Sequence, residues 1–497
     1  MSSTTSSTSG TISSLGVGSG LDSNTIVSKL VALERQPITD LQTAATKIQA
    51  KISAFGQIQS AVSTLHDAAQ KLANPAIWSS TTSTSSDSNA VSFTTDTGAA
   101  VGNYTVSVTA LATPQSVVTN TALASTTSTL GSGTLTFDLG TWSNGVFTGK
   151  TGASSVSVNI ASTDTLEDIR DKINGSGAGV MASIVSDSSG ARLAISSSTT
   201  GAANGFRITA SDSDGNNADD AGLSALAYDP ANGTTGTKPT RTASDAAATI
   251  NGVNVTSSTN KFSNVLTGIS FTVGKLTTTS SKDVPPVVTD SPVNVQVSQD
   301  NDTISKAIND FATSYSALAT LLQNDTKYDD STKTAGPLQA DSTAVSIMNQ
   351  FRALIGSSTP ASSKYGTLSS IGVTIQTGGT LSVDSTKLTN ALGNLSDVKK
   401  LFSNADLGNS ANDGIATKLR TLTDDLMGFD GALTTRTAGL NQSVTDNQKQ
   451  QDALDARATL YENRLKAQYS ALDTTMASLN GTSSYVTQMI TAMNKSS

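Results

Sequence analysis

Apolar side chains in the stretch that follows Asp22 recur every three or four positions, which is the period of one face of an α-helix. From Ile48 onwards these steps alternate as they do along the seam of a coiled coil. Asp22 is placed to cap the first turn, and Asn74 with Pro75 closes the segment. Pro37 lacks an amide hydrogen and its ring clashes with the preceding turn, so we expect it to end or kink the helix and leave two helical pieces.

The pattern changes over residues 79–297, where apolar and polar positions alternate in short runs separated by Ser, Thr, Gly and Asn. A period of two predicts half-buried β-strands. One short helix is predicted among them, capped by Ser162 or Asp164 and ended near Asn174. Two strands joined by a turn at 187–190 follow that helix. The middle of the chain is therefore predicted to be a β-rich head that contains a β-α-β-β module.

Helical spacing returns beyond the head, interrupted by one predicted hairpin around Gly378 and Gly379. A helix at each end of the chain, without a partner nearby in sequence, buries its apolar stripe most simply against the other, so we expect the ends to pair. Asn447, Gln451 and Gln468 stand in the C-terminal seam, where polar residues lower stability and limit register. We therefore expect the ends to be poorly ordered in the free monomer. The helical segments predicted here are 304–322, 345–355, 415–427 and 440–493.

The predicted fold class is α+β with several domains, in which N- and C-terminal helices pair as a coiled-coil-like leg and β-rich head domains are inserted between them. Three glycines, Gly16, Gly18 and Gly20, predict a hinge before the first helix. The predicted domains are residues 1–40 and 441–497 as leg helices, flexible in the monomer; 41–78 and 298–440 as a mainly helical domain with a β-hairpin; 79–118 and 241–297 as a β-rich head domain; and 119–240 as an inserted second head domain. The side chains predicted to pack between the leg helices are Ile48, Ile52, Phe55, Val62, Leu65, Leu454, Tyr461, Leu465, Leu472, Met476 and Leu479.

The amino-acid composition makes some classes of protein function less consistent with this chain than others. A chain of 497 residues with 36% hydrophobic residues is long enough for several modest cores. Only 14% of its residues are charged, and Ser, Thr, Asn and Ala take their place, as on an extracellular, strand-rich surface. The net charge of -8 opposes phosphate binding, which needs clustered lysine and arginine. We therefore expect no nucleic-acid partner.

The chain contains no cysteine, so it has neither disulfides nor a thiolate metal site. Its Ser- and Thr-rich N-terminus has neither the cationic nor the apolar region of a Sec signal peptide. No run approaches the roughly 18 apolar residues of a membrane-spanning helix. We expect no membrane span, and export by a route that does not cleave a conventional signal, such as type III export.

Candidate catalytic groups are few. The one histidine, His66, lies on the predicted N-terminal helix, where a surface histidine is a simpler interpretation than the base of a triad. Neighbouring carboxylates such as Asp424 and Asp425 give no evidence that they flank a substrate. Trp78 and Trp142 are scattered and do not suggest a sugar-stacking groove.

Asp212, Asp214 and Asn216 resemble the start of a calcium loop, but Asn217 stands where that loop needs glycine and Leu223 where it needs glutamate. A solvated turn is the simpler interpretation. The N-terminal glycine run lacks the preceding strand and the spacing of a dinucleotide-binding loop. We therefore predict no catalytic residue, no cofactor site and no metal site, and we expect that the chain is not an enzyme.

The run Leu15-Gly-Val-Gly-Ser-Gly-Leu-Asp22, followed by residues 26–31, Glu34, Gln36 and Pro37, closely resembles the N-terminal region of the flagellar filament cap family, FliD, also called flagellar hook-associated protein 2. Residues 156–210 resemble the flagellin-type insertion module, whereas 119–154 are less diagnostic. The resemblance extends through residues 102–112, 248–253, 264–268, 371–373, 381–384, 398–402 and the terminal heptads.

The resemblance implies a ring-like homo-oligomer at the distal tip of the bacterial flagellum, outside the cell. Its heads would form a plate and its helical ends would reach down as legs, while exported flagellin folds and inserts beneath it. The partners implied are flagellin, the hook-filament junction protein, the flagellar type III export apparatus and a cytoplasmic export chaperone. The candidate chaperone-binding residues are Leu472, Met476, Leu479, Val486 and Met489, whose apolar stripe would otherwise self-associate.

Two alternatives stay open at this point. Another axial flagellar component, such as a flagellin, would share paired terminal helices, absent cysteine and β-rich insertions, although the opening at 15–22 argues against it. An exported adhesin would use the Ser- and Thr-rich head for cell adhesion and the helices as a stalk.

Overall fold

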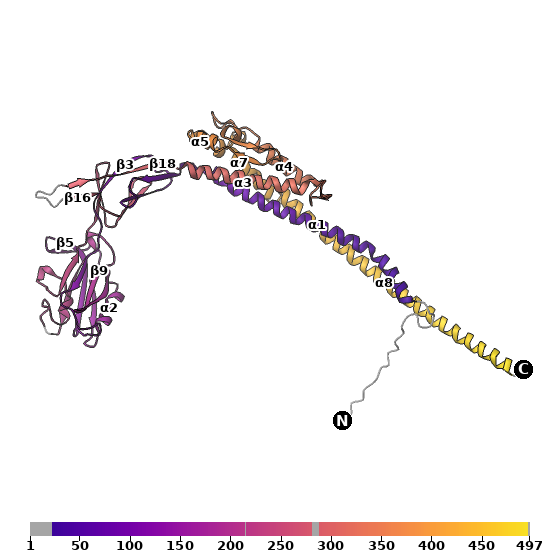
Figure 1. The fold of residues 1–497 in the computed structure, drawn as a ribbon, viewed down its shortest axis with the longest axis horizontal. Helices are drawn as coiled ribbons and strands as arrows, with labels where there is room; N and C mark the ends of the chain where they lie inside the picture. Colours follow the sequence, from indigo (N-terminus) through magenta and orange to yellow (C-terminus); the bar gives the residue numbers. More distant parts are fainter. Residues whose placement is uncertain (1–21, 214, 281–287, 496–497) are drawn as a thin grey trace, which may run out of the picture. The chain divides into compact units, whose positions relative to one another are not determined.

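The computed structural model describes residues 22–213, 215–280 and 288–495, and the chain divides into two units by its internal contacts. The terminal unit combines residues up to Pro75 with those from Ser305 onwards, and the head unit is Ala76–Ile304. Long helices stand at both ends of the described chain and the sheets of the head lie between them in sequence (Figure 1). The predicted α+β fold class is therefore confirmed. The finer division into four domains stays a prediction.

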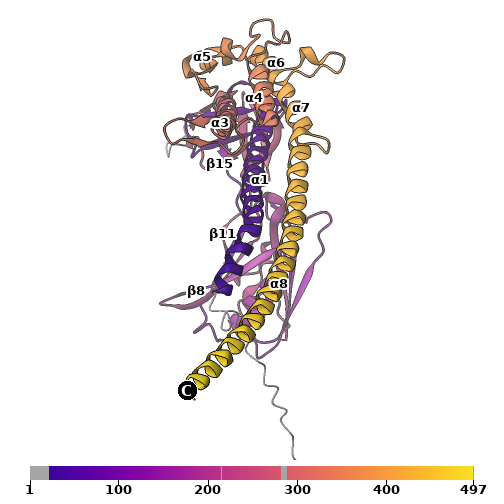
Figure 2. The ribbon, with the colours of Figure 1, turned by 90° about the vertical axis from the view of Figure 1, so that its right-hand side faces the viewer.

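Two long helices run side by side in the terminal unit: α1 (Ser23–Ala73) and α8 (Ala432–Lys495) (Figures 1 and 2). The carboxylate of Asp22 accepts the Thr25 amide at 3.0 Å, so the predicted N-cap is confirmed. The helix ends at Ala73, directly before the Asn74-Pro75 pair, as predicted.

The expectation that Pro37 divides this segment is wrong, because α1 is continuous from Ser23 to Ala73. Pro37 lies on the exposed side of α1, where the carbonyl that loses its hydrogen bond, that of Leu33, is on a solvent-facing residue as well. Contacts with α8 hold the helix on both sides of the proline, at Glu34 and at Leu41. Access of water to the freed carbonyl and these contacts together let the helix continue past the proline, where an interior proline ordinarily costs about 3 kcal/mol.

The rest of the terminal unit forms a helical body around the C-terminal half of α1. The rings of Phe311 and Phe402 meet edge to face there, 6.2 Å apart, and both are fully buried. The predicted hairpin is confirmed, and the Ser316 hydroxyl accepts the Leu381 amide at 2.8 Å and so ties it to α3. The elements are α3 (Asn301–Thr326), β19 (Tyr328–Asp329), β20 (Thr334–Ala335), α4 (Ser342–Ile355), β21 (Val373–Ile375), β22 (Leu381–Val383), α5 (Ser385–Leu392), α6 (Leu395–Ser403) and α7 (Ile415–Met427), with short 3₁₀ turns at Leu368–Ile371 and Ser410–Asn412.

One core of the head unit lies between a five-stranded sheet, in the order β1-β18-β3-β12-β13, and a three-stranded sheet, β14-β15-β2. The rings of Phe262 and Phe271 stack in it, 4.4 Å apart. The predicted alternation is visible along β18, where Val293, Val295 and Val297 are buried and the residues between them are exposed. The strands are β1 (Thr81–Ser85), β2 (Val91–Thr95), β3 (Gly102–Ala110), β12 (Ala246–Ile250), β13 (Val253–Ser257), β14 (Lys261–Leu266), β15 (Ile269–Val273) and β18 (Val293–Gln299), with a 3₁₀ turn at Ile77–Ser79 before them and a small ladder of β16 (Thr278–Ser280) and β17 (Val288–Asp290).

A second core of the head unit lies between the sheet β10-β5-β6, in which β5 also pairs with β7, and the sheet β11-β4-β9-β8. Helix α2 packs its one apolar face into this core through Leu166, Ile169 and Ile173. The elements are β4 (Ser116–Thr119), β5 (Gly133–Ser143), β6 (Val146–Gly149), β7 (Val156–Ile160), α2 (Leu166–Gly175), β8 (Val180–Asp187), β9 (Gly190–Ser197), β10 (Gly205–Asp212) and β11 (Thr237–Arg241), with 3₁₀ turns at Ala202–Asn204, Gly222–Leu226 and Pro230–Asn232.

The predicted β-α-β-β order is confirmed, but the predicted cap of α2 is wrong. Neither Ser162 nor Asp164 caps the helix; Thr165 does, in a capping box with Asp168. The Thr165 hydroxyl accepts the Asp168 amide at 3.2 Å, and the Asp168 carboxylate accepts the Thr165 amide at 2.9 Å. The Asp168 pKa is lowered mainly by its hydrogen bond with the Thr165 hydroxyl. The predicted turn after β8 is confirmed by the Asp187–Gly190 pair that closes the hairpin.

Candidate assembly surface

The two long helices of the terminal unit meet in a small apolar cluster near the start of α1. Val27 and Val31 pack against Leu465 of α8, and all three are buried. Leu30, Tyr461 and Tyr469 surround them and are half-buried. Because these contacts are few, they stabilise this end of the helix pair less than the core stabilises the helical body.

Charged side chains fix the antiparallel alignment of the pair. Arg457 of α8 contacts the Glu34 carboxylate through two nitrogens, at 2.8 and 2.9 Å, and Arg35 lies 3.3 Å from Asp455. The pKa of Glu462 is lowered, chiefly by its hydrogen bond with Lys466. Such exposed ion pairs contribute about 0.2–1 kcal/mol each, so they select register more than they add stability.

Two of the polar residues predicted in the C-terminal seam lie at the helix contact. Asn447 is buried and its Nδ2 donates to the Leu41 carbonyl of α1 at 3.1 Å. The Gln451 Nε2 donates to the Asn447 Oδ1 at 2.6 Å. A shift of α8 along α1 would leave the Asn447 amide buried without this partner, so the pair of amides specifies one register.

Nine of the eleven predicted leg-packing residues are buried or half-buried and divide into three groups. Phe55, Val62 and Leu65 are fully buried, but within the helical body, where α1 contacts α7 as well as α8. Leu465 is buried in the small cluster described above. Ile48, Ile52, Leu454, Tyr461 and Met476 are half-buried.

Leu472 and Leu479 do not pack between the two helices of one chain. Leu472 is 43% exposed and Leu479 is 58% exposed. Because α1 begins at Ser23 and its first buried valine already lies against Leu465, α8 continues beyond the start of its partner. The predicted hinge glycines, Gly16, Gly18 and Gly20, lie outside the described residues.

The far end of α8 therefore presents a row of apolar side chains to solvent, which we call the C-terminal stripe. Leu472, Leu479, Val486 and Met493 follow Leu465 at steps of seven, so the surface is patterned for a second helix. Exposed apolar rows of this kind mark interaction sites. The exposed members are Leu472, Leu479, Tyr485, Val486, Met489, Ile490 and Met493.

Two polar contacts in the terminal unit are not evident from sequence spacing. His66 is not a surface histidine: its Nδ1 lies 2.9 Å from the Thr423 hydroxyl and 3.4 Å from Asp424, and its side chain is mostly buried. Asp341 caps α4 and accepts a hydrogen bond from Arg436 at 2.6 Å. Both contacts join segments far apart in the chain, so only the fold brings them together.

Comparison with known proteins identifies the family. Residues 19–115 match the family "Flagellar hook-associated protein 2 N-terminus", residues 243–481 match "Flagellar hook-associated protein 2 C-terminus", and residues 146–199 match "Flagellin hook IN motif". The chain is 32% identical over 490 residues to flagellar hook-associated protein 2 of Escherichia coli K12, covering 96% of this chain and 97% of the relative. The chain belongs to the flagellar hook-associated protein 2 family.

Further relatives and one solved structure agree with this family. The B-type flagellar hook-associated protein 2 of Pseudomonas aeruginosa is 27% identical over 473 residues, which cover 92% of this chain and 93% of that protein. The crystal structure of the D1-D2-D3 domains of the flagellar cap protein FliD from Escherichia coli superposes with a TM-score of 0.60 at 28% identity. That match covers 78% of this chain and 99% of the other. The chain is thus a flagellar filament cap protein, and the alternatives of an adhesin or another axial component are not favoured.

Members of the flagellar hook-associated protein 2 family are structural proteins, and the candidate chemistry of this chain has structural explanations. The Asp212 carboxylate accepts the Ser224 amide and hydroxyl at 3.1 and 2.9 Å and so ties its loop down, while Asp214 lies outside the described residues. Trp142 donates to the Phe206 carbonyl at 2.9 Å, and Trp78 is buried. No cluster of three or more metal-ligating side chains occurs among the described residues.

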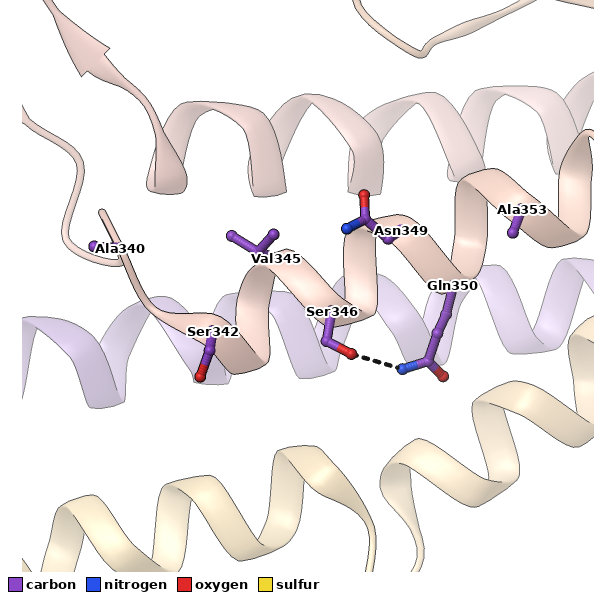
Figure 3. A pocket seen from close by; sticks show the side chains of 7 residues that line it. All are labelled: Ala340, Ser342, Val345, Ser346, Asn349, Gln350 and Ala353. Atoms are coloured by element: carbon purple, nitrogen blue, oxygen red, sulfur yellow. Dashed lines mark hydrogen bonds between the residues drawn. The ribbon is translucent and has the colours of Figure 1, made fainter.

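One open depression of this cap protein lies along the outer face of α4 (Figure 3). The Gln350 side chain donates to the Ser346 hydroxyl there at 3.2 Å. No carboxylate, histidine, lysine or arginine is among the described residues that line the depression. Within the described residues, no helix is both long and apolar enough to cross a membrane. The lining residues are Ala340, Ser342, Val345, Ser346, Asn349, Gln350 and Ala353.

Proposed function

We propose that the chain forms a ring-like oligomer at the distal tip of the filament, outside the cell, beneath which exported flagellin folds and inserts. The observation that carries the proposal is the C-terminal stripe, which continues the heptad seam past Leu465 with apolar side chains open to solvent. A surface that is incomplete in one chain is what an assembly subunit needs. Filaments that lose their cap would lose flagellin to the medium.

The proposed mechanism is mechanical. The leg ends in a cluster of three buried residues and a few exposed ion pairs, so it opens locally at low cost. The helical body holds its own core and stays folded while the legs move. The legs of the ring can thus release and rebind as each new subunit enters, without unfolding the chain.

Deletion of the gene tests this function directly. We expect cells with hooks but without full filaments, and monomeric flagellin in the medium, because subunits would leave the channel without being retained. Electron microscopy of the cells and immunoblotting of the medium measure the two effects, with restoration by a plasmid copy as the control. Filaments of normal length and clean medium would exclude a capping role.

The proposal includes partners that act before and during assembly. A cytoplasmic export chaperone would mask the C-terminal stripe before the chain enters the type III export apparatus, and the hook-filament junction protein would carry the first cap. An apolar helix face exposed in the cytoplasm promotes self-association, and a groove that accepts such a face prevents it. The stripe therefore supplies a physical reason for a chaperone.

Truncation after Tyr469 tests the chaperone part alone. It removes the candidate residues Leu472, Met476, Leu479, Val486 and Met489 but leaves the Leu465 cluster and both ion pairs with α1 in place. We expect co-purification of the chaperone from the cytoplasm to be lost while the far-UV circular dichroism shows a folded chain. Undiminished co-purification would exclude the stripe as the main chaperone site.

A further inference from the structure

The sheet β11-β4-β9-β8 of the head unit has two edges of different character. Strand β11 carries features that hinder the addition of another strand: Pro239 lacks an amide hydrogen, Lys238 is an exposed charge, and the register shifts beside Pro239. Strand β8 is eight residues long, with neither proline nor lysine, and pairs with β9 without a register shift. The β8 strand itself therefore lacks the features that hinder strand addition at β11.

The outward backbone groups of β8 follow from one contact at the end of α2. Asn174 accepts the Ala182 amide at 2.7 Å and donates to the Ala182 carbonyl at 2.9 Å, so these two groups point away from β9. Because residues of an antiparallel strand alternate between its two sides, Ile184 and Ser186 also direct their amides and carbonyls outward. Helix α2 packs against β8 and occupies its edge at Ala182. Within the described residues, no strand of the head and no backbone group pairs with the outward groups of Ile184 and Ser186.

The side chains of β8 complement this open edge. Val180 and Ala182 face the core, whereas Met181 and Val185 are exposed on the opposite face of the sheet. An added strand would gain hydrogen bonds from the backbone of β8 and apolar contacts from these two side chains. Asn174 limits the available length, because it already occupies the edge at Ala182.

We infer that the β8 edge binds the β8 edge of a second copy of this chain, antiparallel, with Val185 on the twofold axis. In that register Ile184 exchanges backbone hydrogen bonds with Ser186 of the second copy, and Ser186 with Ile184 of the second copy. The inference concerns the head unit alone and goes beyond the proposed capping function.

Two features of β8 favour a second copy in this register over an unrelated strand. Asp187 falls opposite Ser183 of the second copy, so no two like charges face each other and the hydroxyl can donate to the carboxylate. The strand ends at Asp187, so the hairpin turn of the second copy begins at the point where Asn174 covers Ala182. The part of each β8 edge that is open to pairing lies beyond Ala182. Its length therefore matches the length of β8 that the second copy offers.

The contact is small and we expect it to be weak between free chains. A few paired residues bury much less than the roughly 1,000 Å² of a stable interface. The same contact strengthens when other contacts hold chains together and raise their effective concentration. A twofold contact joins two copies and does not by itself close a ring of more than two. It is therefore separate from the contacts that close the ring.

Disulfide trapping tests the contact, because the chain has no cysteine of its own. In full-length Val185→Cys the two thiols of a pair would lie on the twofold axis, at directly opposite positions about 4.5–5.5 Å apart at Cβ, near the range for a disulfide. We expect mild oxidation of the purified chain to give a covalent dimer on a non-reducing gel. Val253→Cys is the matched control: it is 65% exposed against 53% for Val185, and it lies on the edge strand of a different sheet.

A second substitution separates strand pairing from random collision. Ser186→Pro removes an outward amide only, and leaves the β8–β9 ladder intact, so Val185→Cys combined with Ser186→Pro should fold normally and give several-fold less dimer. Thermal unfolding confirms that both variants are folded. The inference is overturned if Val185→Cys dimerises no more than Val253→Cys, if proline at 186 has no effect, or if Val185→Cys is trapped only on another protein in cells. Because the test uses the purified chain, its result does not depend on whether the chain caps filaments.

Discussion

Replacing Phe55 by alanine is expected to lower the free energy of unfolding of the terminal unit by about 3–5 kcal/mol. Phe55 is among the largest fully buried side chains of the protein and lies on the part of α1 that is enclosed by the helical body. Its removal forfeits the transfer free energy of the ring and leaves a cavity that the surrounding helices fill only partly. A loss of this size is a large share of the stability of an ordinary domain.

Chemical denaturation followed by far-UV circular dichroism measures this effect, because most of the described helix belongs to the terminal unit. Phe429→Ala is the matched control: Phe429 is in the same unit but is 92% exposed, so its truncation should change the free energy of unfolding by less than about 0.5 kcal/mol. Equal changes in the two variants would show that the core around Phe55 does not determine the stability of this unit.

Elements with strong periodicity were predictable from the sequence. The pattern over 415–427 coincides with α7, because its apolar face repeats at helical spacing and glycines stand at both ends. The hairpin of β8 and β9 was predictable from alternating runs around a two-residue turn. In both cases the local preference and the tertiary environment favour the same structure.

Two predictions were wrong because each followed from one local rule, while a second local or tertiary effect favoured a different structure. Pro37 predicts an end or a kink, but the helix does not end there, because its exposed position lets water reach the freed carbonyl and contacts with α8 keep the helix continuous. The cap of α2 was assigned to Ser162 or Asp164, although Thr165 with Asp168 three positions later is itself the capping-box pattern. The sequence therefore contains the signal for the observed cap, and it is stronger than that of Ser162 or Asp164 alone.

Other features depend on tertiary contacts that the spacing of residues along the sequence does not reveal. A heptad pattern indicates a face to be covered but not where the partner ends, so Leu472 and Leu479 were predicted to pack and are instead exposed. The burial of His66 against Thr423 arises from the packing of α1 on α7, more than 350 positions apart in the chain. The hinge glycines and the finer domain division stay predictions.

Replacing Leu465 by alanine is expected to open the leg without unfolding the protein. Leu465 is 8% exposed and belongs to a cluster with only two other buried residues, so its truncation should cost about 2 kcal/mol, the low end for a buried leucine. Because the cluster lies apart from the core around Phe55, the loss should appear as local opening near the start of α1. Global unfolding should change little.

Hydrogen exchange of the backbone amides near Val27 and Leu465 measures this opening, and about 2 kcal/mol corresponds to exchange roughly 30-fold faster if it proceeds through the local open state. Leu460→Ala is the matched control, a leucine on the same helix that is 71% exposed. Exchange that is equal in the two variants would mean that Leu465 does not hold the leg. If exchange rises in Leu465→Ala and filament growth falls with it, while Leu460→Ala keeps both unchanged, then assembly depends on the paired state of the helices and not merely on the presence of α8.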